Sequence, residues 1–260
     1  GNIYIWKDFD RTELTCVNGN LCMLLSYPNE PPYFLEPFGR NKPVETVKIL
    51  LAHVGRVARV SRDFAALLPR ERFQLIPQRN QFDYVYLREE LAALKGRKYD
   101  GKRNHIKRFK TKFPEYEFAP LTPDHKKEAL ALFEKWFKVR EESKYFPRVA
   151  HTAQKGAINT AFTYFEKLNL FGGRLMVGGT MKGFTLGSRL NPATVSVHFL
   201  YTDPELPGSS QTVLWEACNR TYSAFKYINL EQDLGIPGLR TAKLSYHPLK
   251  LAESLEDRTV

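Results

Sequence analysis

The stretch that decides the fold is residues 172–201, which read GGRLMVGGTMKGFTLGSRLNPATVSVHFLY. It contains three runs of strand-forming residues, and the pairs Gly178-Gly179 and Asn191-Pro192 separate these runs as turns. Connections this short join neighbouring strands that run in opposite directions. The stretch therefore predicts a three-stranded antiparallel meander, with strands at Gly172–Val177, Met181–Leu190 and Thr194–Tyr201.

A helix and a fourth strand follow this meander. Pro204–Ser210 is rich in Pro, Gly and Ser and is predicted to be a loop, which leads into a helix at about 211–225 and a strand at Lys226–Leu230. Backbone N–H groups at such a helix start can bind an anion, so Ser209 and Ser210 are candidate substrate-binding residues. The alternative is ordinary capping of the helix by one of these serines.

Short strands and two helices are expected before residue 100. An Asn18-Gly19-Asn20 turn predicts a hairpin, and Pro43–Val54 has helical spacing of its apolar residues before Gly55. The expected strands are Asn2–Trp6, Glu13–Val17, Leu21–Ser26, Tyr33–Leu35, Phe73–Pro77 and Asp83–Leu87. The remaining helices are expected at Arg62–Leu68, after a Thr122 cap, at about 147–168 and at Pro237–Leu244.

Composition places the chain among globular proteins. It has 260 residues, of which 43% are hydrophobic and 26% charged, so it can bury a sizeable core. No apolar run reaches the ~18–20 residues that cross a bilayer, and we expect a cytoplasmic protein without a transmembrane segment. Cys16, Cys22 and Cys218 are too few and too scattered for a disulfide framework or a zinc site, so buried free thiols and no metal are expected.

The positive charge of the chain is concentrated in one segment. The net charge is +11, and Lys95–Lys112 holds nine Lys and Arg residues against Asp100 alone. Ile106, Phe109 and Phe113 recur at helical spacing, which predicts a helix with one apolar face and basic residues over the rest. A local positive patch favours a polyanionic partner, although a solvated helix face is the alternative. The candidate nucleic-acid-binding residues are Lys98, Lys102, Arg103, Lys107 and Arg108.

A third group of charged residues surrounds the turn after the Lys226–Leu230 strand. Asn229, Glu231, Asp233, Arg240 and Lys243 lie between this strand and the next helix, and strand-end loops commonly carry functional sites. Arg240 and Lys243 are three residues apart on the predicted helix and so share a face with one another. The alternative is a salt-bridged turn in which Asp233 and Arg240 pair with each other. No His–Ser or His–Cys pair for nucleophilic catalysis is evident from the sequence.

Two long motifs resemble a known family. They are Leu94-Lys95-Gly96-Arg97-Lys98 continuing to Phe109, and Asn229-Leu230-Glu231-Gln232-Asp233-Leu234-Gly235-Ile236-Pro237-Gly238-Leu239-Arg240 continuing to Pro248. Together they are similar to proteins related to the C-terminal domain of phosphatidylglycerol lysyltransferase, over nearly the whole chain. The resemblance implies an α/β (α+β) protein of two fused GNAT-like (acyl-CoA N-acyltransferase) folds with mixed, largely antiparallel sheets. We expect the units at residues 1–96 and 97–260, the second beginning with the basic helix.

The resemblance also implies an activity, because the family is kin to the Fem aminoacyltransferases. We expect an enzyme that moves an amino acid from charged tRNA to an amine or hydroxyl acceptor, with aminoacyl-tRNA as co-substrate and no further cofactor. Residues 238–246 are similar to the Fem-type segment Gly-Leu-x-x-Phe-Lys-x-x-Phe, with Ala242 in place of the aromatic residue. Lys243 would then stabilise the oxyanion, beside Asp233 and Arg240 as further catalytic residues. Glu231 or Asp233 would hold the substrate ammonium, with Asn229 nearby.

Two other functions remain open at this point. The first is an acyl-CoA-dependent N-acyltransferase, although the Gln/Arg-x-x-Gly-x-Gly/Ala loop for acetyl-CoA is replaced by Pro207-Gly208-Ser209-Ser210-Gln211. The second is a catalytically idle GNAT-like module that binds RNA through Lys95–Lys112. The acceptor is open among small molecules, peptides and lipids, and the lipid acceptor of the membrane enzymes does not carry over to a chain without a membrane segment.

Overall fold

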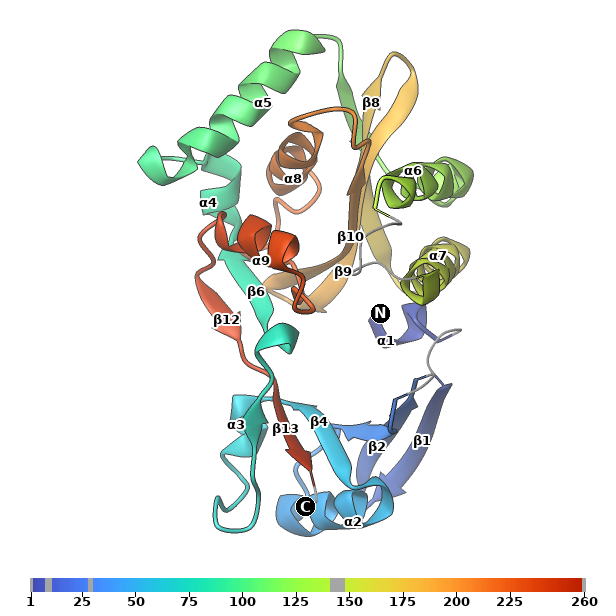
Figure 1. Ribbon diagram of the computed structural model, residues 1–260, viewed down its shortest axis with the longest axis vertical. Coiled ribbons are helices and arrows are strands. Elements are labelled where there is room, and N and C mark those ends of the chain that lie inside the picture. Colours follow the sequence, from blue (N-terminus) through green and yellow to red (C-terminus); the bar gives the residue numbers. More distant parts are fainter. Residues whose placement is uncertain (1, 8–10, 28–29, 141–147, 259–260) are drawn as a thin grey trace. The chain divides into compact units, whose positions relative to one another are not determined.

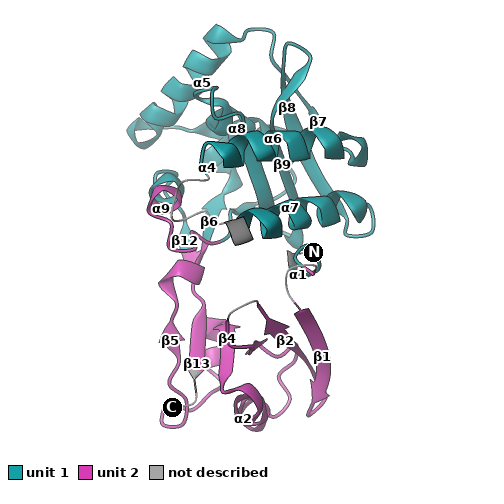
Figure 2. Cartoon of the chain, turned by 45° about the vertical axis from the view of Figure 1, so that its right-hand side comes forward, with its two compact units in different colours: residues 1–6, 84–231, 241–250 teal, residues 7–83, 232–240, 251–260 magenta. Residues whose placement is uncertain are grey.

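The computed structural model describes residues 2–7, 11–27, 30–140 and 148–258. Two compact units divide the chain in an interleaved way, and Figure 2 distinguishes them by colour. Unit 1 holds residues 1–6, 84–231 and 241–250, and unit 2 holds residues 7–83, 232–240 and 251–260. A compact unit and a fold unit need not share boundaries, so the division at residues 1–96 and 97–260 stays a prediction.

Unit 2 is built on a six-stranded sheet with the order β1-β2-β3-β4-β13-β5. The first three strands pair antiparallel, and β4 pairs parallel with β3 after the crossover helix α2. The strands are β1 (Arg11–Val17), β2 (Asn20–Ser26), β3 (Tyr33–Leu35), β4 (Arg56–Val60), β5 (Ile76–Pro77) and β13 (Leu255–Arg258). The helices are α2 (Pro43–Val54), α3 (Arg62–Ala65) and the 3-10 turn η1 (Arg79–Gln81).

Local sequence explains the first hairpin and the first long helix of this unit. Asn18 and Gly19 both have positive φ, 51° and 77°, which is the type I′ geometry that suits a two-residue hairpin. Helix α2 begins at Pro43 and ends before Gly55, whose φ of 71° is the left-handed conformation that terminates a helix. The core of unit 2 contains Cys22, Phe34, Val47, Leu50, Val57, Val60, Phe64, Leu68, Phe73 and Leu255.

Unit 1 is built on a seven-stranded sheet with the order β12-β6-β11-β10-β9-β8-β7. The strands are β6 (Asp83–Leu87), β7 (Glu117–Pro120), β8 (Leu170–Val177), β9 (Thr180–Asn191), β10 (Thr194–Thr202), β11 (Tyr227–Asn229) and β12 (Lys250–Ala252). The helices are α1 (Asn2–Ile5), α4 (Arg88–Ala93), α5 (Asp100–Lys112), α6 (Lys126–Lys138), α7 (Arg148–Thr163), α8 (Ser209–Asn219) and α9 (Pro237–Leu244), with 3-10 turns η2 (Arg97–Tyr99) and η3 (Pro123–His125). Helix α9 crosses the boundary between the units after residue 240, and strand β12 crosses it after residue 250.

The predicted meander is confirmed in unit 1. Strands β8, β9 and β10 pair antiparallel in sequence, and β11 pairs parallel with β10 after α8. Helices α6 and α7 lie on one face of this sheet and α8 lies on the other (Figure 1). The unit 2 sheet repeats this order of three antiparallel strands, a crossover helix and a parallel strand. The predicted fold class, two GNAT-like folds with mixed and largely antiparallel sheets, is therefore confirmed.

Each sheet is extended by a strand from a distant part of the chain. Strand β6 follows the unit 2 strands in sequence but pairs antiparallel with β11 of unit 1. Strand β13, near the C-terminus, pairs antiparallel with β4 of unit 2. These two strands occupy equivalent places in the two sheets, next to the parallel strand that follows the crossover helix. The exchange explains why the compact units are interleaved along the chain.

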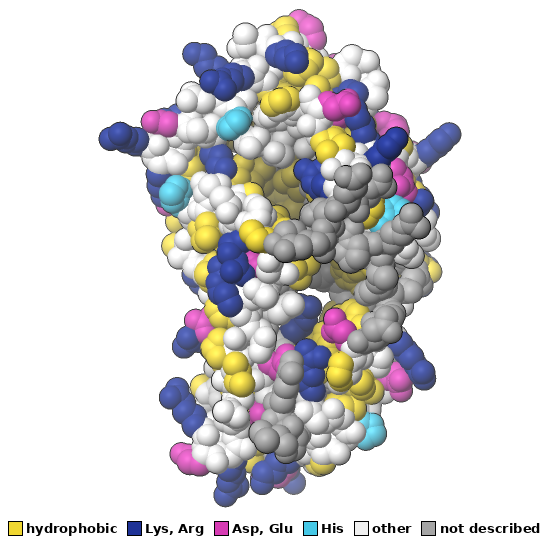
Figure 3. All heavy atoms as spheres, in the orientation of Figure 1, with side chains coloured by type: hydrophobic (Ala, Val, Ile, Leu, Met, Phe, Trp, Pro, Cys, Tyr) yellow, Lys and Arg dark blue, Asp and Glu magenta, His cyan; other side chains and the backbone are white. Residues whose placement is uncertain are grey.

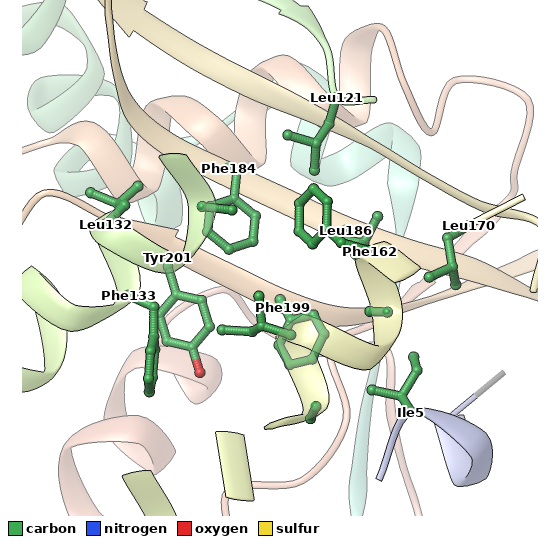
Figure 4. Close-up of a cluster of buried hydrophobic side chains, with 14 of the residues drawn as sticks. Ile5, Leu121, Leu132, Phe133, Phe162, Leu170, Phe184, Leu186, Phe199 and Tyr201 are labelled. Carbon is green, nitrogen blue, oxygen red and sulfur yellow. The ribbon is translucent and has the colours of Figure 1, made fainter. Parts of the chain in front are cut away.

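The main core of unit 1 lies between its sheet and helices α6 and α7. Figure 4 shows Phe133 of α6 beside Tyr201 of β10, and the two rings meet edge to face with centroids 5.2 Å apart. Phe184 and Leu186 of β9 and Phe199 of β10 point into the same core and are almost completely buried. This face of the sheet is therefore apolar along the middle of β9 and β10, and any polar group on it stands out.

Two sequence predictions need correction. Residues 2–5 form the short helix α1 rather than a strand, because Ile5 is buried in the unit 1 core while Tyr4 packs edge to face on Tyr164 of the same unit. Cys16 is exposed, whereas Cys22 and Cys218 are buried, and all three are free thiols. Burial raises the pKa of the Cys218 thiol to about 12, so it is inert at neutral pH. Pro147, the predicted first residue of α7, lies outside the described residues.

Candidate active site

The end of strand β11 places two of the predicted substrate-binding residues. Strand β11 stops at Asn229, and Glu231 takes a left-handed conformation with φ of 57°. The Glu231 backbone N–H donates to the Asn229 side-chain oxygen at 2.7 Å, which holds this turn. A left-handed residue other than glycine costs free energy, and such residues occur often at functional sites.

The Glu231 carboxylate joins a polar network on the sheet. Its Oε1 lies 2.7 Å from Nδ1 of His198 and accepts a hydrogen bond from the Ser196 hydroxyl at 3.0 Å. The opposite ring nitrogen, Nε2, lies 2.8 Å from the Ser188 hydroxyl. The His198 side chain is 2% exposed and that of Glu231 is 16% exposed, so the network is buried but open at the carboxylate. A serine, a histidine and a carboxylate are therefore connected in line.

A β-bulge directs His198 into this network. Ser196 stands opposite Ser188 in the β9–β10 ladder, and the register then shifts between Val197 and Phe199, which leaves His198 as the extra residue. Gly187 is required here, because a Cβ at that position would lie 2.5 Å from the Ser196 carbonyl oxygen. The bulge brings the His198 ring to Ser188 and Glu231 while Phe199 remains in the apolar core.

Lys243 reaches the same residue from helix α9. Its Nζ donates to the backbone carbonyl of Leu230 at 2.7 Å and to that of Glu231 at 3.2 Å. The Tyr86 hydroxyl donates to the Lys243 carbonyl at 2.8 Å, and Lys243 Nζ lies 5.7 Å from the centroid of the Tyr84 ring. Its ammonium is thus fixed beside the Glu231 turn. We call Ser188, Ser196, His198, Asn229, Glu231 and Lys243 the Glu231 cluster.

Asp233 has a different environment, in unit 2. Its carboxylate is 0% exposed and pairs with Arg240 at 2.8 Å and with Arg79 at 3.1 Å. Arg240 makes a second hydrogen bond to the other carboxylate oxygen at 2.9 Å, and the Gly235 N–H donates to that oxygen at 2.8 Å. Arg240 also donates to the Asn80 side chain at 2.7 Å. This bidentate pair matches the salt-bridged turn expected as the alternative. A catalytic role for Asp233 and Arg240, and a pocket that they share with Lys243, stay predictions.

Ser209 and Ser210 are the first two residues of helix α8, whereas the sequence predicted them at the end of the preceding loop, and neither caps the helix with its side chain. The N-cap is Gly208, with φ of 89°, and the Ser209 side chain is buried. A Cβ on Gly208 would lie 2.5 Å from the His105 carbonyl oxygen, so the backbone of α5 packs directly against the first turn of α8. A role of Ser209 and Ser210 in substrate binding stays a prediction.

The basic helix α5 packs on unit 1 through its apolar face, as its spacing indicates. Ile106 and Phe109 are buried, whereas Arg103, Lys107 and Arg108 are exposed. In Figure 3 dark-blue side chains project from the part of the molecule where Figure 1 places α5. This arrangement supplies cationic groups to solvent along one helix of unit 1.

Three of the five candidate basic residues, Lys98, Lys102 and Arg103, are held by neighbours. Lys102 Nζ donates to the Ser245 hydroxyl at 2.6 Å and lies 4.0 Å from the Tyr246 ring centroid, and burial lowers the pKa of Lys102 below its usual value. Lys98 pairs with Glu90 at 2.8 Å, and Arg103 pairs with Asp100 and donates to the Gly96 carbonyl at 2.9 Å. Lys107 and Arg108 are therefore better placed for phosphate contacts than these three residues. Nucleic-acid binding by this helix stays a prediction.

The described part of the chain holds neither a candidate membrane-spanning helix nor a candidate metal site. No helix there is both long enough and apolar enough to cross a membrane. Residues 2–7, 11–27, 30–140 and 148–258 also hold no group of three or more His, Cys, Asp or Glu side chains that could bind a metal ion.

His198, Ser188 and Ser196 were missed in the sequence. Alternation along β10 would place Val195, Val197 and Phe199 on one face and Ser196 and His198 on the other, so a polar pair facing one side was visible. Its partners are Ser188 of β9 and Glu231, the second residue after β11, which lie 10 and 33 residues away from His198. Only the strand order and the bulge bring them together.

Comparison with known proteins defines the class. The whole chain resembles a conserved protein of unknown function from Bacteroides thetaiotaomicron, with 32% identity, a TM-score of 0.87 and coverage of 100% of this chain and 89% of that one. It shares its fold with the C-terminal domain of a putative lysylphosphatidylglycerol synthetase from Agrobacterium fabrum, at 12% identity, a TM-score of 0.69 and coverage of 98% and 86%. It also shares its fold with L-PGS from Bacillus licheniformis, at 14% identity, a TM-score of 0.67 and coverage of 97% and 85%.

Residues 1–255 match the family described as "Phosphatidylglycerol lysyltransferase, C-terminal". This family and the fold together indicate a lysyltransferase-like acyltransferase of the GNAT type. The chain belongs to this family, as its two long motifs predicted. A search of curated proteins found no match.

Proposed function

We propose that this protein is an aminoacyltransferase that moves an amino acid from charged tRNA to a hydroxyl or amine acceptor. The observation that carries the proposal is the Glu231 cluster. It presents a fixed ammonium, Lys243, and a partly exposed carboxylate, Glu231, at one strand end. Attack on an aminoacyl ester builds negative charge on the carbonyl oxygen, which a fixed cation stabilises, while a carboxylate suits the α-ammonium of the amino acid.

The basic helix supports tRNA as the donor. Arg103, Lys107 and Arg108 offer exposed cations that can contact phosphates without reading bases. The first turn of α8 supports the same choice over acyl-CoA. The loop before that turn has the single glycine Gly208 in place of the two small residues of the acetyl-CoA motif, which weakens the case for a pyrophosphate cradle.

The family suggests the first substrates to test. The matching family is named for phosphatidylglycerol lysyltransferase, which brings back the lipid acceptor that the sequence alone did not support. Lysine is therefore the first amino acid and phosphatidylglycerol the first lipid acceptor, with small molecules and peptides as further candidates. A charged-tRNA donor also fits the expected cytoplasmic location, where aminoacyl-tRNA is made.

The test is incubation of the protein with a mixture of charged tRNAs, and separately with acetyl-CoA, each with phosphatidylglycerol vesicles. We expect faster loss of amino acid from one tRNA class than spontaneous hydrolysis gives, and no acetyl transfer. Consumption of acetyl-CoA alone would favour the N-acyltransferase. Binding of tRNA without any transfer would favour an idle RNA-binding module.

A further inference from the structure

Ser188 and His198 have no part in the electrostatic mechanism above, although both belong to the network that ends at Glu231. The His198 side chain is 2% exposed, and both ring nitrogens have polar partners within 2.8 Å. Burying polar groups costs free energy even when they are satisfied, so an apolar side chain would serve packing alone equally well.

The local backbone is shaped to build this network. His198 is the extra residue of a β-bulge, and Glu231 has a left-handed φ of 57°. Bulges next to active sites commonly redirect a side chain, and strained residues persist where the surrounding structure fixes them. The same residue, Glu231, contacts His198 through its carboxylate and Lys243 through its carbonyl. Both kinds of group that ester transfer uses, a cation and a base, therefore converge on one residue.

We propose that Ser188, His198 and Glu231 form a proton relay for acyl transfer. This inference rests on the proposed function. In the tautomer with the proton on Nδ1, His198 donates to Glu231 and its Nε2 accepts from the Ser188 hydroxyl. Ser188 then contacts the acceptor, His198 is the base, and Glu231 orients the ring and stabilises the imidazolium when it forms.

The relay balances the reaction without a further reactant. The acceptor oxygen or nitrogen forms a bond to the carbonyl carbon of the aminoacyl ester, and its proton passes to Ser188 while the Ser188 proton passes to His198 Nε2. The bond between the carbonyl carbon and the ribose oxygen of the tRNA then breaks. His198 returns its proton through Ser188 to this leaving oxygen, and the relay regains its starting state.

A nucleophilic Ser188 is the competing chemistry. It would form a serine ester similar in energy to the ester that it consumes, and the substrate is already activated for direct attack. In direct attack by a hydroxyl group, removal of its proton is still a barrier, and a general base lowers that barrier. The relay therefore explains the same three residues with one chemical step fewer than a path through a serine ester.

Substitution of His198 tests the relay, with a matched histidine as control. His151 lies 2.8 Å from Glu134 in unit 1, so His151→Gln removes a similar histidine–carboxylate pair elsewhere. The probe is lysyl-tRNA with phosphatidylglycerol vesicles, followed by the mixture of charged tRNAs. We expect His198→Gln to lower the single-turnover transfer rate about 100-fold or more. Its KM for charged tRNA and its melting temperature should stay close to those of the parent. His151→Gln should keep the parent rate.

Chemical rescue separates a base from a scaffold residue. Added imidazole should restore part of the rate to His198→Ala, which a purely structural role does not predict. An active parent whose His198→Gln variant works within twofold of it would overturn the relay and leave the transferase intact. An aminoacyl adduct on Ser188 would overturn the relay in favour of the nucleophile. A parent that leaves every charged tRNA intact would overturn the transferase and the relay together.

Discussion

Glu231 and Asp233 stand two residues apart in one motif, yet the structure treats them in opposite ways. The Glu231 side chain is 16% exposed and bonds to neutral or titratable groups, His198 and Ser196. The Asp233 side chain is 0% exposed and is neutralised by two arginines. The carboxylate that can exchange partners is suited to chemistry, whereas the one saturated by fixed cations is suited to holding a turn. Residue type and position in a motif do not separate these roles, because the partners decide them.

The Asp233 side of this comparison gives the largest expected effect, a loss of folding stability. Asp233→Ala leaves Arg79 and Arg240 without their shared carboxylate and frees the Gly235 N–H, so we expect the free energy of unfolding to fall by about 3 kcal/mol. Urea denaturation of the parent and the variant measures it. A loss below about 0.5 kcal/mol would show that the pair contributes no more than a surface ion pair.

The Glu231 side of the comparison predicts a large fall in transfer rate when the neighbouring Lys243 is removed. Lys243→Ala removes the cation beside Glu231, and we expect the transfer rate to fall about 100-fold, the scale for one oxyanion-stabilising group. Lys243→Arg keeps the charge and should recover part of the rate. Thermal melting serves as the control, and the two variants should melt close to the parent. An unchanged rate in Lys243→Ala would remove Lys243 from the mechanism.

The sequence predicted local elements better than the site. Helix α2 was placed by Pro43 and Gly55, and α9 by its Pro237 start, because helix termini depend on nearby residues. The Asp233–Arg240 pair was also recognised as an alternative, since its partners are seven residues apart. The strand predicted at residues 2–6 was wrong, because alternation over five residues is too short to separate a strand from a helix turn that buries Ile5.

The part of the site that the sequence did not predict depends on pairing between strands that are distant in sequence. His198, Ser188 and Glu231 meet only because β9, β10 and β11 lie side by side and a bulge shifts the register. A bulge leaves no clear sign in a strand whose alternation of apolar and polar residues reads normally on both sides. The interleaving of the two units likewise follows from β6 and β13 pairing far from their sequence neighbours.

The basic helix adds a smaller effect and extends the comparison to the surfaces of the two units. Replacing Lys102, Arg103, Lys107 and Arg108 by Ala should weaken tRNA binding about tenfold at moderate salt. It should also reduce the log–log salt slope by about one for each phosphate that the variant no longer neutralises. Because Lys102 is held by Ser245 and Tyr246, Lys107→Ala with Arg108→Ala should give most of the effect.

The matched control lies in unit 2. Arg40, Lys48, Arg70 and Arg72 are exposed there, and replacing all four by Ala removes the same charge. Filter binding or anisotropy at several salt concentrations compares the sets. Equal weakening by both sets would mean that only net charge matters, and unchanged binding by the α5 variant would leave that helix as a solvated face.

A third carboxylate, Asp203, tests whether ion pairing stabilises the fold as it does at Asp233, because its contribution to stability should depend on pH. Burial alone would raise the pKa of Asp203, but hydrogen bonds from Lys135, the Glu205 N–H and Lys182 outweigh it and lower the pKa below the usual value. The folded pKa is depressed, so the stabilisation is present above the unfolded pKa of about 3.9 and is lost as pH falls through the folded value. Asp203→Asn should cost about 1 kcal/mol of unfolding free energy at neutral pH. This gap should narrow below about pH 4, and a gap independent of pH would contradict the ion-pair origin.

The most direct test of the account compares Glu231→Gln with Asp233→Asn, which change one charge each at positions two residues apart. Single-turnover transfer from charged tRNA and thermal melting are measured for both variants, with rates taken at a temperature where both are folded. The account predicts that Glu231→Gln loses about 100-fold in rate and melts close to the parent, while Asp233→Asn melts several degrees lower and keeps a rate within a few-fold of the parent. The reverse pattern, with rate lost at Asp233 and stability lost at Glu231, would contradict it.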